Sequence, residues 1–284
     1  MKTLLLPALV STILLADCIS TGNVRPGWQK DPKALAFPVA DTPRKLTPLM
    51  ERELRGCVDF FWHEWVQDPK SPTYGMVCGN YVGLEMPVQI AMEEQGFAFC
   101  AIVIGVDRGW IPREEGEKRI LITLNTIKKL KTIKGFYYHF IDQKTGLRSH
   151  NVELSNASTG TMIMGALIAG EYFGGKVKDL ANELYAKMDW KWFTNPKTKH
   201  PYLACYPEDR PTNYKIVGEV SKDGHFGGWA GYGEHMFLYI LGAGAPNPEF
   251  ATGVDSYYAM MIPKGRYKGE EFIFCGSGAA FTYQ

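Results

Sequence analysis

Three acidic residues lie where aromatic and polar side chains gather in the sequence, as expected of a site that acts on a polar substrate. Asp142 ends an aromatic run, Glu153 lies in a short polar segment, and Glu234 lies among aromatic residues. Hydrolysis of a glycosidic bond needs two carboxyl groups, one to protonate the leaving oxygen and one to activate water or attack carbon. We therefore take Asp142, Glu153 and Glu234 as candidate catalytic residues.

Glu234 is the candidate best suited to donate a proton. We expect it at the start of an apolar helix, beside Trp229, Tyr232 and His235, and an apolar setting raises the pKa of a carboxyl group. Two ordinary structural roles stay open at this point. A glutamate in the first turn of a helix often caps that helix, and Glu153 could cap the helix that follows it or pair with a nearby arginine.

Metal and nucleotide sites are not expected. His139, His150 and His235 could bind a metal only if the fold gathered them, because no close spacing such as H-E-x-x-H occurs. The glycine-rich pieces near Gly224 and Gly276 lack the strand, glycine and helix order of a phosphate-binding loop. The sequence therefore predicts no metal and no cofactor.

The overall composition favours a single globular domain. The chain has 284 residues, 45% of them hydrophobic, which is enough for one good-sized core. Its 31 Lys and Arg against 30 Asp and Glu give a net charge of +1, so nucleic acid is an unexpected partner. The 7 Trp, 15 Tyr and 15 Phe can stack on sugar rings, although most aromatic residues simply fill a core.

The N-terminus predicts export. Residues 1–17 have the positive start and short apolar run of a signal peptide, and this run is too short to span a bilayer. It leads to Cys18 in a context like a lipoprotein cleavage box, where Asp17 fits poorly, so Cys18 is a candidate lipid anchor. We expect a periplasmic or outer-membrane lipoprotein, or a secreted protein. Residues 18–47 read as a linker or arm, and residues 48–284 as the domain.

The remaining cysteines are scattered and contain no C-x-x-C pair. Neither a zinc site nor a dense disulfide framework is expected, and buried free thiols are the favoured reading. These cysteines are Cys57, Cys78, Cys100, Cys205 and Cys275.

Apolar periodicity predicts an all-α fold with short β inserts. Apolar residues recur at steps of three or four, as one face of a helix requires. A short strand and turn are expected within residues 135–155, and a long aromatic loop within 190–221. The expected helices cover residues 48–67, 87–106, a segment opened by Pro112, then 158–173, 177–188 and 229–241.

A series of motifs resembles the glucoamylase-like domain of bacterial exported proteins. That family includes endo-β-1,2-glucanases and the transglycosylating domain of cyclic glucan synthases. The motifs keep the family's order over most of residues 50–284. They are Phe60-Phe61-Trp62, Gly96-Phe97-Ala98, the run 104–110 (IGVDRGW), the run 135–142 (GFYYHFID), Glu153-Leu154-Ser155, Met188-Asp189-Trp190 and the run 232–236 (YGEHM).

The resemblance implies a toroid of α/α hairpins of the six-hairpin barrel type, with a sugar cleft at one end and no metal. It implies Glu153 and Glu234 as active-site acids, with Asp142 and Trp229 lining the cleft. We take Glu234 as the general acid and Glu153 as the other charged participant. The expected substrate-binding residues are Trp229, Tyr232, His235, His139, Tyr138, Trp110 and Arg108.

Two departures from the family pattern bear on activity. Ser158 stands where the family usually has an acidic residue, and a hydroxyl cannot replace a carboxylate as a base. The chain also ends at Gln284, in what resembles the start of a longer family segment, so we expect a ring that is incomplete at its C-terminal part.

The leading hypothesis is a monomeric glycoside hydrolase acting on β-linked glucan, most like an endo-β-1,2-glucanase. The alternative is a non-catalytic carbohydrate-binding protein, or an inactive fragment of such an enzyme.

Overall fold

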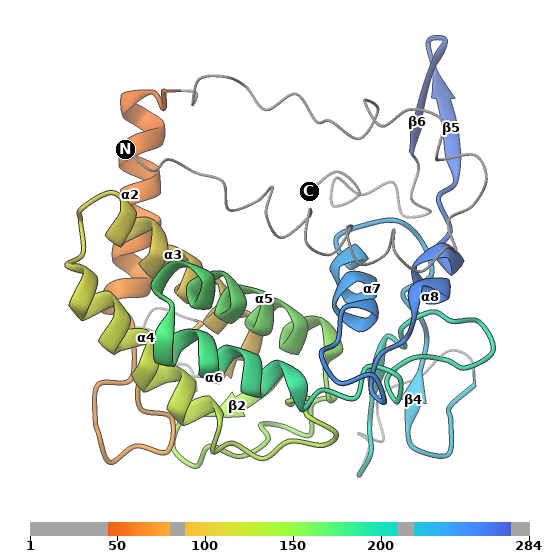
Figure 1. Ribbon diagram of the computed structural model, residues 1–284, viewed down its shortest axis with the longest axis horizontal. Coiled ribbons are helices and arrows are strands. Elements are labelled where there is room, and N and C mark those ends of the chain that lie inside the picture. The colour runs from red at the N-terminus through yellow and green to blue at the C-terminus, as the bar shows by residue number, and fades with distance from the viewer. Residues whose placement is uncertain (1–44, 80–88, 209–218, 274–284) are drawn as a thin grey trace. The chain divides into compact units, whose positions relative to one another are not determined.

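The computed structural model describes residues 45–79, 89–208 and 219–273, and its regular structure is mainly helical (Figure 1). The chain divides into two units, Met1–Gly56 and Cys57–Gln284. In the first unit the described residues begin the first helix, where the Met50 amide donates to Thr47 Oγ1 at 3.2 Å. The helices are α2 (Pro48–His63), α3 (Met92–Asp107), α4 (Arg113–Ile127), α5 (Asn156–Phe173), α6 (Gly175–Ala186), α7 (Met236–Ala243) and α8 (Val254–Ala259).

Five of the six predicted helices occur with their ends moved by a few residues. The helix expected from residue 87 begins at Met92, because Gln89–Ala91 form a strand, β1, paired with β2 (Phe140–Asp142). The helix expected from 158 or 159 begins at Asn156, because Ser155 accepts a hydrogen bond from the Ser158 amide and caps it.

The predicted helix over 229–241 is wrong in its first half. Helix α7 begins only at Met236, because the preceding backbone is bonded to other segments. The Trp229 amide donates to the Pro201 carbonyl at 2.9 Å, and the Tyr232 amide donates to the Met261 carbonyl at 2.8 Å. Such bonds to distant residues hold this segment in a non-helical path.

Helices α3 and α5 approach each other very closely and form the centre of the core. A Cβ atom on Gly96 would lie 2.3 Å from the Thr161 carbonyl oxygen, and one on Gly165 would lie 2.3 Å from the Gly96 carbonyl oxygen. Helix α5 also packs on α6 (Figure 1). Only glycine allows this approach, because any side chain would push the two backbones apart.

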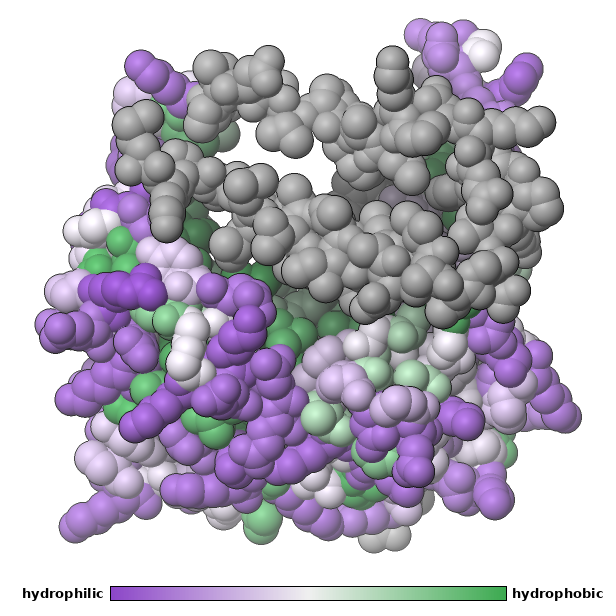
Figure 2. All heavy atoms as spheres, viewed as in Figure 1, coloured by the Kyte–Doolittle hydropathy of each residue, from purple (hydrophilic) through white to green (hydrophobic). Residues whose placement is uncertain are grey.

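The surface of α4 and α6 is polar. Figure 2 shows hydrophilic side chains over the part of this face where these two helices lie, and Glu114, Glu115, Lys178 and Asp179 are among the exposed residues. Both helices therefore turn one side to the core and the other to solvent, as amphipathic helices do.

Short antiparallel pairs complete the described chain. The region expected as a long loop contains β3 (Ala204–Cys205), which pairs with β4 (His225–Phe226). Single bridges join Tyr138 to Leu154 and Leu154 to Cys205, so the residues around Glu153 are held between two other segments. Helix α8 and the hairpin of β5 (Lys264–Tyr267) and β6 (Glu270–Ile273) were not predicted.

The four cysteines within the described residues are free. Cys78 and Cys205 are buried, as expected, whereas Cys57 is exposed; Cys18 and Cys275 lie outside the described residues. No helix in the described part of the chain has the length and apolar character needed to cross a membrane.

The close contact of α3 and α5 gives a test by substitution. Gly96→Ala places a methyl group against the backbone of α5, and we expect it to lower the free energy of unfolding by about 1–3 kcal/mol. Gly56→Ala in α2 is the matched control, because nothing lies within 4 Å of its added Cβ. It should raise stability by up to about 1 kcal/mol, since alanine favours helix. Urea unfolding measures both, and equal effects would contradict the contact.

Candidate active site

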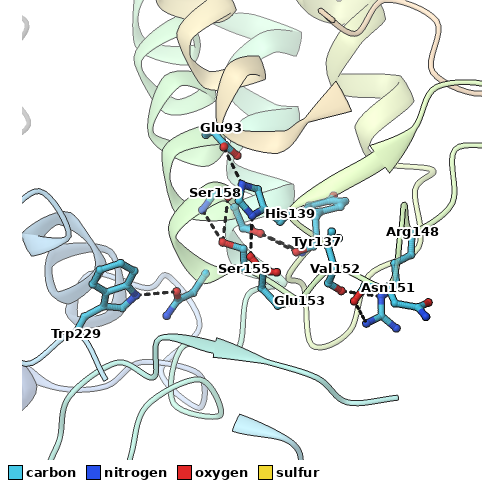
Figure 3. A network of polar contacts seen from close by, with 12 residues as sticks. Glu93, Tyr137, His139, Arg148, Asn151, Val152, Glu153, Ser155, Ser158 and Trp229 are labelled. Carbon is cyan, nitrogen blue, oxygen red and sulfur yellow. Dashed lines mark hydrogen bonds and ion pairs between the residues drawn. The ribbon is translucent and has the colours of Figure 1, made fainter. Parts of the chain in front are cut away.

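The candidate site lies at the N-terminal ends of α3 and α5, around His139 (Figure 3). His139 Nδ1 is 2.7 Å from Glu153 Oε1, and His139 Nε2 is 3.0 Å from Glu93 Oε1. The backbone sets this arrangement, because the His139 amide donates to the Glu153 carbonyl at 3.0 Å and the Met92 amide donates to the His139 carbonyl at 3.2 Å. One imidazole thus joins two carboxylates from different elements.

The three side chains are partly accessible, so a substrate can approach them. His139 and Glu93 are each 28% exposed and Glu153 is 25% exposed. The His139 ring also stacks on Phe140, with 4.0 Å between ring centroids and an interplanar angle of 13°. The stacking and the two polar contacts together fix the plane of the ring.

Opposite charges govern ionisation in this cluster. Burial opposes the charged form of His139, but hydrogen bonds to Glu153 and Glu93 and their negative charges outweigh it and raise the pKa of His139 to about 9. Burial likewise opposes ionisation of Glu153 and of Glu93. The hydrogen bond from His139 and its charge nevertheless leave the pKa of each carboxyl below its ordinary value.

The neighbouring Glu94 behaves differently. Burial and the negative charge of Glu93 raise the pKa of Glu94 to about 7. Its carboxylate lies against Gly79, where an added Cβ would come within 2.3 Å of it. The pKa values of these two consecutive glutamates on α3 thus differ: Glu93 is held ionised, whereas Glu94 can carry a proton near neutral pH.

Trp229 is hydrogen-bonded to the N-terminal end of α5. Trp229 Nε1 donates to Asn156 Oδ1 at 3.4 Å (Figure 3), and the Trp229 ring stacks on His235 with centroids 4.8 Å apart. The Asn156 amide nitrogen donates to the Tyr202 carbonyl at 2.8 Å, which fixes the orientation of the Asn156 side chain. Trp229, Tyr232 and His235 are all half-buried.

Glu234 does not lie in the predicted setting. Its side chain is exposed and it precedes α7 by two residues, so the apolar helical environment on which its assignment as general acid rested is absent. His235 beside it is held by the Gly231 carbonyl, and burial lowers the pKa of His235. Glu234 is linked to the N-terminal end of α5 through its neighbour His235, whose ring stacks on Trp229.

Asp142 and Tyr138 have local roles in the structure. Asp142 Oδ1 accepts bonds from the Lys144 amide at 3.1 Å and from the Thr145 amide and hydroxyl at 2.8 Å each, and the hydrogen bonds from Thr145 lower the pKa of Asp142. Its carboxylate therefore anchors the turn after β2. Tyr138, predicted to contact substrate, is 1% exposed; the alternation along this segment turns its side chain into the core.

Arg108 and Trp110 lie at the other end of α3. Glu93 is in the first turn of this helix and Arg108 is its C-cap, so at 1.5 Å per residue they are about 22 Å apart along the axis. Trp110 packs on the cluster of Val58 and Ile111. The structure therefore does not bring Arg108 and Trp110, both predicted to bind substrate, together with Glu93 and Glu153.

The sequence reasoning missed Glu93. Acidic residues in the first turn of a helix are common because they favour the helix dipole, and this conceals their other roles. The available indication was a Glu-Glu pair opening an otherwise apolar helix. The described residues contain no group of three His, Cys, Asp or Glu placed to hold a metal ion.

The ionisation of His139 predicts a pH-dependent stability. The pKa of His139 in the folded chain, about 9, lies above its ordinary 6.5, so its contribution is complete below pH 6.5 and is lost as pH rises through about 9. We expect His139→Gln to lower the free energy of unfolding more at about pH 7.5 than at about pH 9.5. Urea unfolding at the two pH values measures the difference.

His225→Gln is the control for this experiment. His225 is buried, and burial lowers its pKa to about 4, so the ring is neutral at both pH values in the folded chain. Its replacement should have the same effect on stability at both. A loss for His139→Gln that does not decline with pH would contradict the charged network.

Comparisons with known proteins agree with this architecture. No family model matches the chain. It is 24% identical over 261 residues to an exo β-1,2-glucooligosaccharide sophorohydrolase (non-reducing end) of Parabacteroides distasonis, and the match covers 80% of this chain and 36% of that protein. The chain thus spans about a third of the length of this curated relative.

Solved structures share the fold. The endo-β-1,2-glucanase of Chitinophaga pinensis, in complex with sophorotriose and glucose, superposes with a TM-score of 0.59 at 21% identity, covering 81% of this chain and 55% of that one. A β-1,2-glucanase of Parabacteroides distasonis superposes with a TM-score of 0.58 at 24% identity, covering 78% of this chain and 31% of that one. The resemblance indicated by the sequence motifs is therefore confirmed: the chain is similar in sequence to a sophorohydrolase and shares the fold of two β-1,2-glucanases.

Proposed function

We propose that this chain is a glycoside hydrolase that cleaves β-1,2-linked glucan or its oligosaccharides. The observation that supports this most is the ion-paired Glu153, partly exposed beside the Asn156 to which Trp229 is bonded. An ionised carboxylate near an aromatic ring is what a site for glycosidic cleavage needs. The sophorohydrolase relative and the two β-1,2-glucanases that share the fold favour this linkage.

The proposed roles follow from charge. Glu153, kept ionised by His139, takes the proton of the attacking water or attacks the anomeric carbon itself. Glu234 gives a proton to the leaving oxygen; this role rests on the family resemblance of the run 232–236 and on its place next to His235 and close in the chain to Trp229. With an attacking water, the hydroxyl of the water bonds to the anomeric carbon as the glycosidic C–O bond breaks, its proton goes to Glu153, and the leaving oxygen takes the proton of Glu234. If Glu153 attacks instead, the glycosyl ester it forms is then hydrolysed by a water that gives its proton to Glu234.

The sugar would lie on the aromatic residues near the N-terminal end of α5. Trp229 is half-buried and its indole is held by Asn156 and His235, so it offers a fixed surface for the C–H face of a sugar ring. Tyr232 and His235 would border it, and His139 would contact it beside Glu153. Asp142 would act indirectly, by holding the turn that follows β2.

A second candidate, carbohydrate binding without cleavage, has one observation in its favour. The Ser158 hydroxyl is bonded to the Ser155 hydroxyl at 3.0 Å, so the first turn of α5 supplies no carboxylate at that position. In this case the aromatic residues would bind oligosaccharide while the bond stays intact.

We also propose an exported monomer. Residues 1–17 would act as the signal peptide, Cys18 as the lipid-bearing residue of a periplasmic or outer-membrane lipoprotein, and residues 18–47 as the linker to the domain at 48–284. If Cys18 carries no lipid, the chain would be secreted. The helical hairpins α3 with α4 and α5 with α6 would form part of an α/α toroid.

The activity test uses three glucans and two variants. We expect reducing sugar to be released from β-1,2-glucan and not from laminarin or cellulose. Glu153→Gln and Glu234→Gln should each lower kcat/KM by about 10²–10⁴-fold, because each removes a proton-transfer group. Glu249→Gln changes an exposed glutamate elsewhere and should keep parental activity.

The outcomes separate the two candidates. No hydrolysis together with oligosaccharide binding in calorimetry would establish the binding protein. Parental turnover in Glu153→Gln or Glu234→Gln would remove that residue from the mechanism.

The localisation test uses the full chain expressed in a bacterium that processes lipoproteins. We expect the mature chain to begin at Cys18 with the mass of added acyl chains, and Cys18→Ser to abolish the added mass. Asp17→Ala is the companion variant, expected to process at least as well because a small residue fits the cleavage box better. A full-length chain kept in the cytoplasm would contradict export.

A further inference from the structure

We infer that Glu93 is a positioning residue of this site: from α3, its carboxylate holds His139 as an imidazolium, so that Glu153 receives a charged hydrogen bond in a fixed direction. The inference rests on the proposed function for its catalytic consequence. Its structural part, the control of His139 by Glu93, stands on the geometry of the network.

The two nitrogens of His139 are both used by acceptors. Glu153 Oε1 lies 2.7 Å from Nδ1 and Glu93 Oε1 lies 3.0 Å from Nε2. Neutral imidazole has one N–H only, so one of the two carboxylates would then face a nitrogen lone pair. The arrangement is satisfied when both nitrogens donate, which is the imidazolium form. Removing Glu93 removes this requirement.

Every charged group that faces His139 can be named within the described residues. Glu93 and Glu94 approach from α3, and Glu153 approaches from the segment before α5. The Ser158 side chain of α5 and the Phe140 ring are neutral neighbours of this cluster. Because Glu94 makes no hydrogen bond to the ring, Glu93 is the residue that opposes Glu153 across it.

A substitution at Ser158 can supply from α5 the negative charge that Glu93 supplies from α3. It is 5% exposed, it is the third residue of α5, and its side chain interacts with the Glu93 carboxylate. An aspartate at this position would place a negative charge next to the one that Glu93 supplies. It also suits the first turn of a helix, where the helix dipole favours acidic residues. Loss of Glu93 can therefore be compensated from the neighbouring helix.

The experiment measures the pKa of His139 by NMR in the full chain with labelled histidine. We expect Glu93→Gln to lower it by about 1 unit or more, because an opposite charge in contact is lost. Adding Ser158→Asp to Glu93→Gln should return it toward the parental value. Glu94→Gln is the matched control: the same change, one residue along α3, should shift the pKa of His139 less than Glu93→Gln does.

The catalytic part is measured as the pH dependence of kcat/KM on β-1,2-glucan. In Glu93→Gln the alkaline limit of activity should move to lower pH by the amount that the pKa of His139 moves, and Ser158→Asp should restore it. A structural role alone would lower activity at all pH values without moving the limit. An unmoved limit with a shifted His139 would therefore overturn the positioning role.

The two proposals fail in different ways. A parent chain that cleaves no glucan contradicts the proposed function, whereas the titration still decides whether Glu93 controls His139. An unshifted pKa of His139 in Glu93→Gln overturns the inference even in an active enzyme. If Glu93→Gln does not fold, Glu93→Asp tests the inference, because the shorter side chain withdraws the carboxylate from His139 Nε2; an unchanged pKa of His139 would overturn it.

Discussion

The site depends on the contact between the backbones of α3 and α5. At Gly96 and Gly165 no side chain separates the two helices, so their first turns lie close enough to share one cluster of polar groups. Glu93 meets Ser158, and Gly96, three residues later, meets Thr161. Equal steps along both helices mean that they run in the same direction. The N-terminal ends therefore open on the same side, where Glu93 and Glu153 lie.

The parallel arrangement of α3 and α5 helps to keep carboxylates ionised at their N-terminal ends. Burial disfavours ionised carboxylates, yet Glu93 and Glu153 both have a lowered pKa. The positive ends of the two helix dipoles favour negative charge there, and His139 adds a full positive charge between the carboxylates. Glu94 receives no such partner, and burial next to Glu93 raises its pKa instead. The same few residues thus contain one carboxyl that holds a proton near neutral pH and two that do not.

Periodicity predicted the helices because burial of one face is a local property, visible every three or four residues. The residues at which two of the helices begin are set instead by contacts between distant segments, which periodicity does not show. Strand pairing with β2 delays α3 to Met92, and bonds to Pro201 and Met261 delay α7 to Met236. In the site, His139 and Glu153 were recognised, whereas Glu93 resembled an ordinary first-turn acid. Arg108 was predicted to bind substrate, and one helix length separates it from Glu93.

Ser158 shows that a negative charge in a site can come from a different sequence position than the family pattern implies. The resemblance implied an acidic residue there, and the hydroxyl in its place suggested a weakened site. In the structure this hydroxyl faces a carboxylate that arrives from α3, so the space beside His139 is still negatively charged. The motif around Glu153 does not show this charge, because Glu93 lies 65 positions before Ser158 in the chain. Because α3 and α5 are in contact at glycines, a carboxylate on the first turn of either helix can lie beside His139.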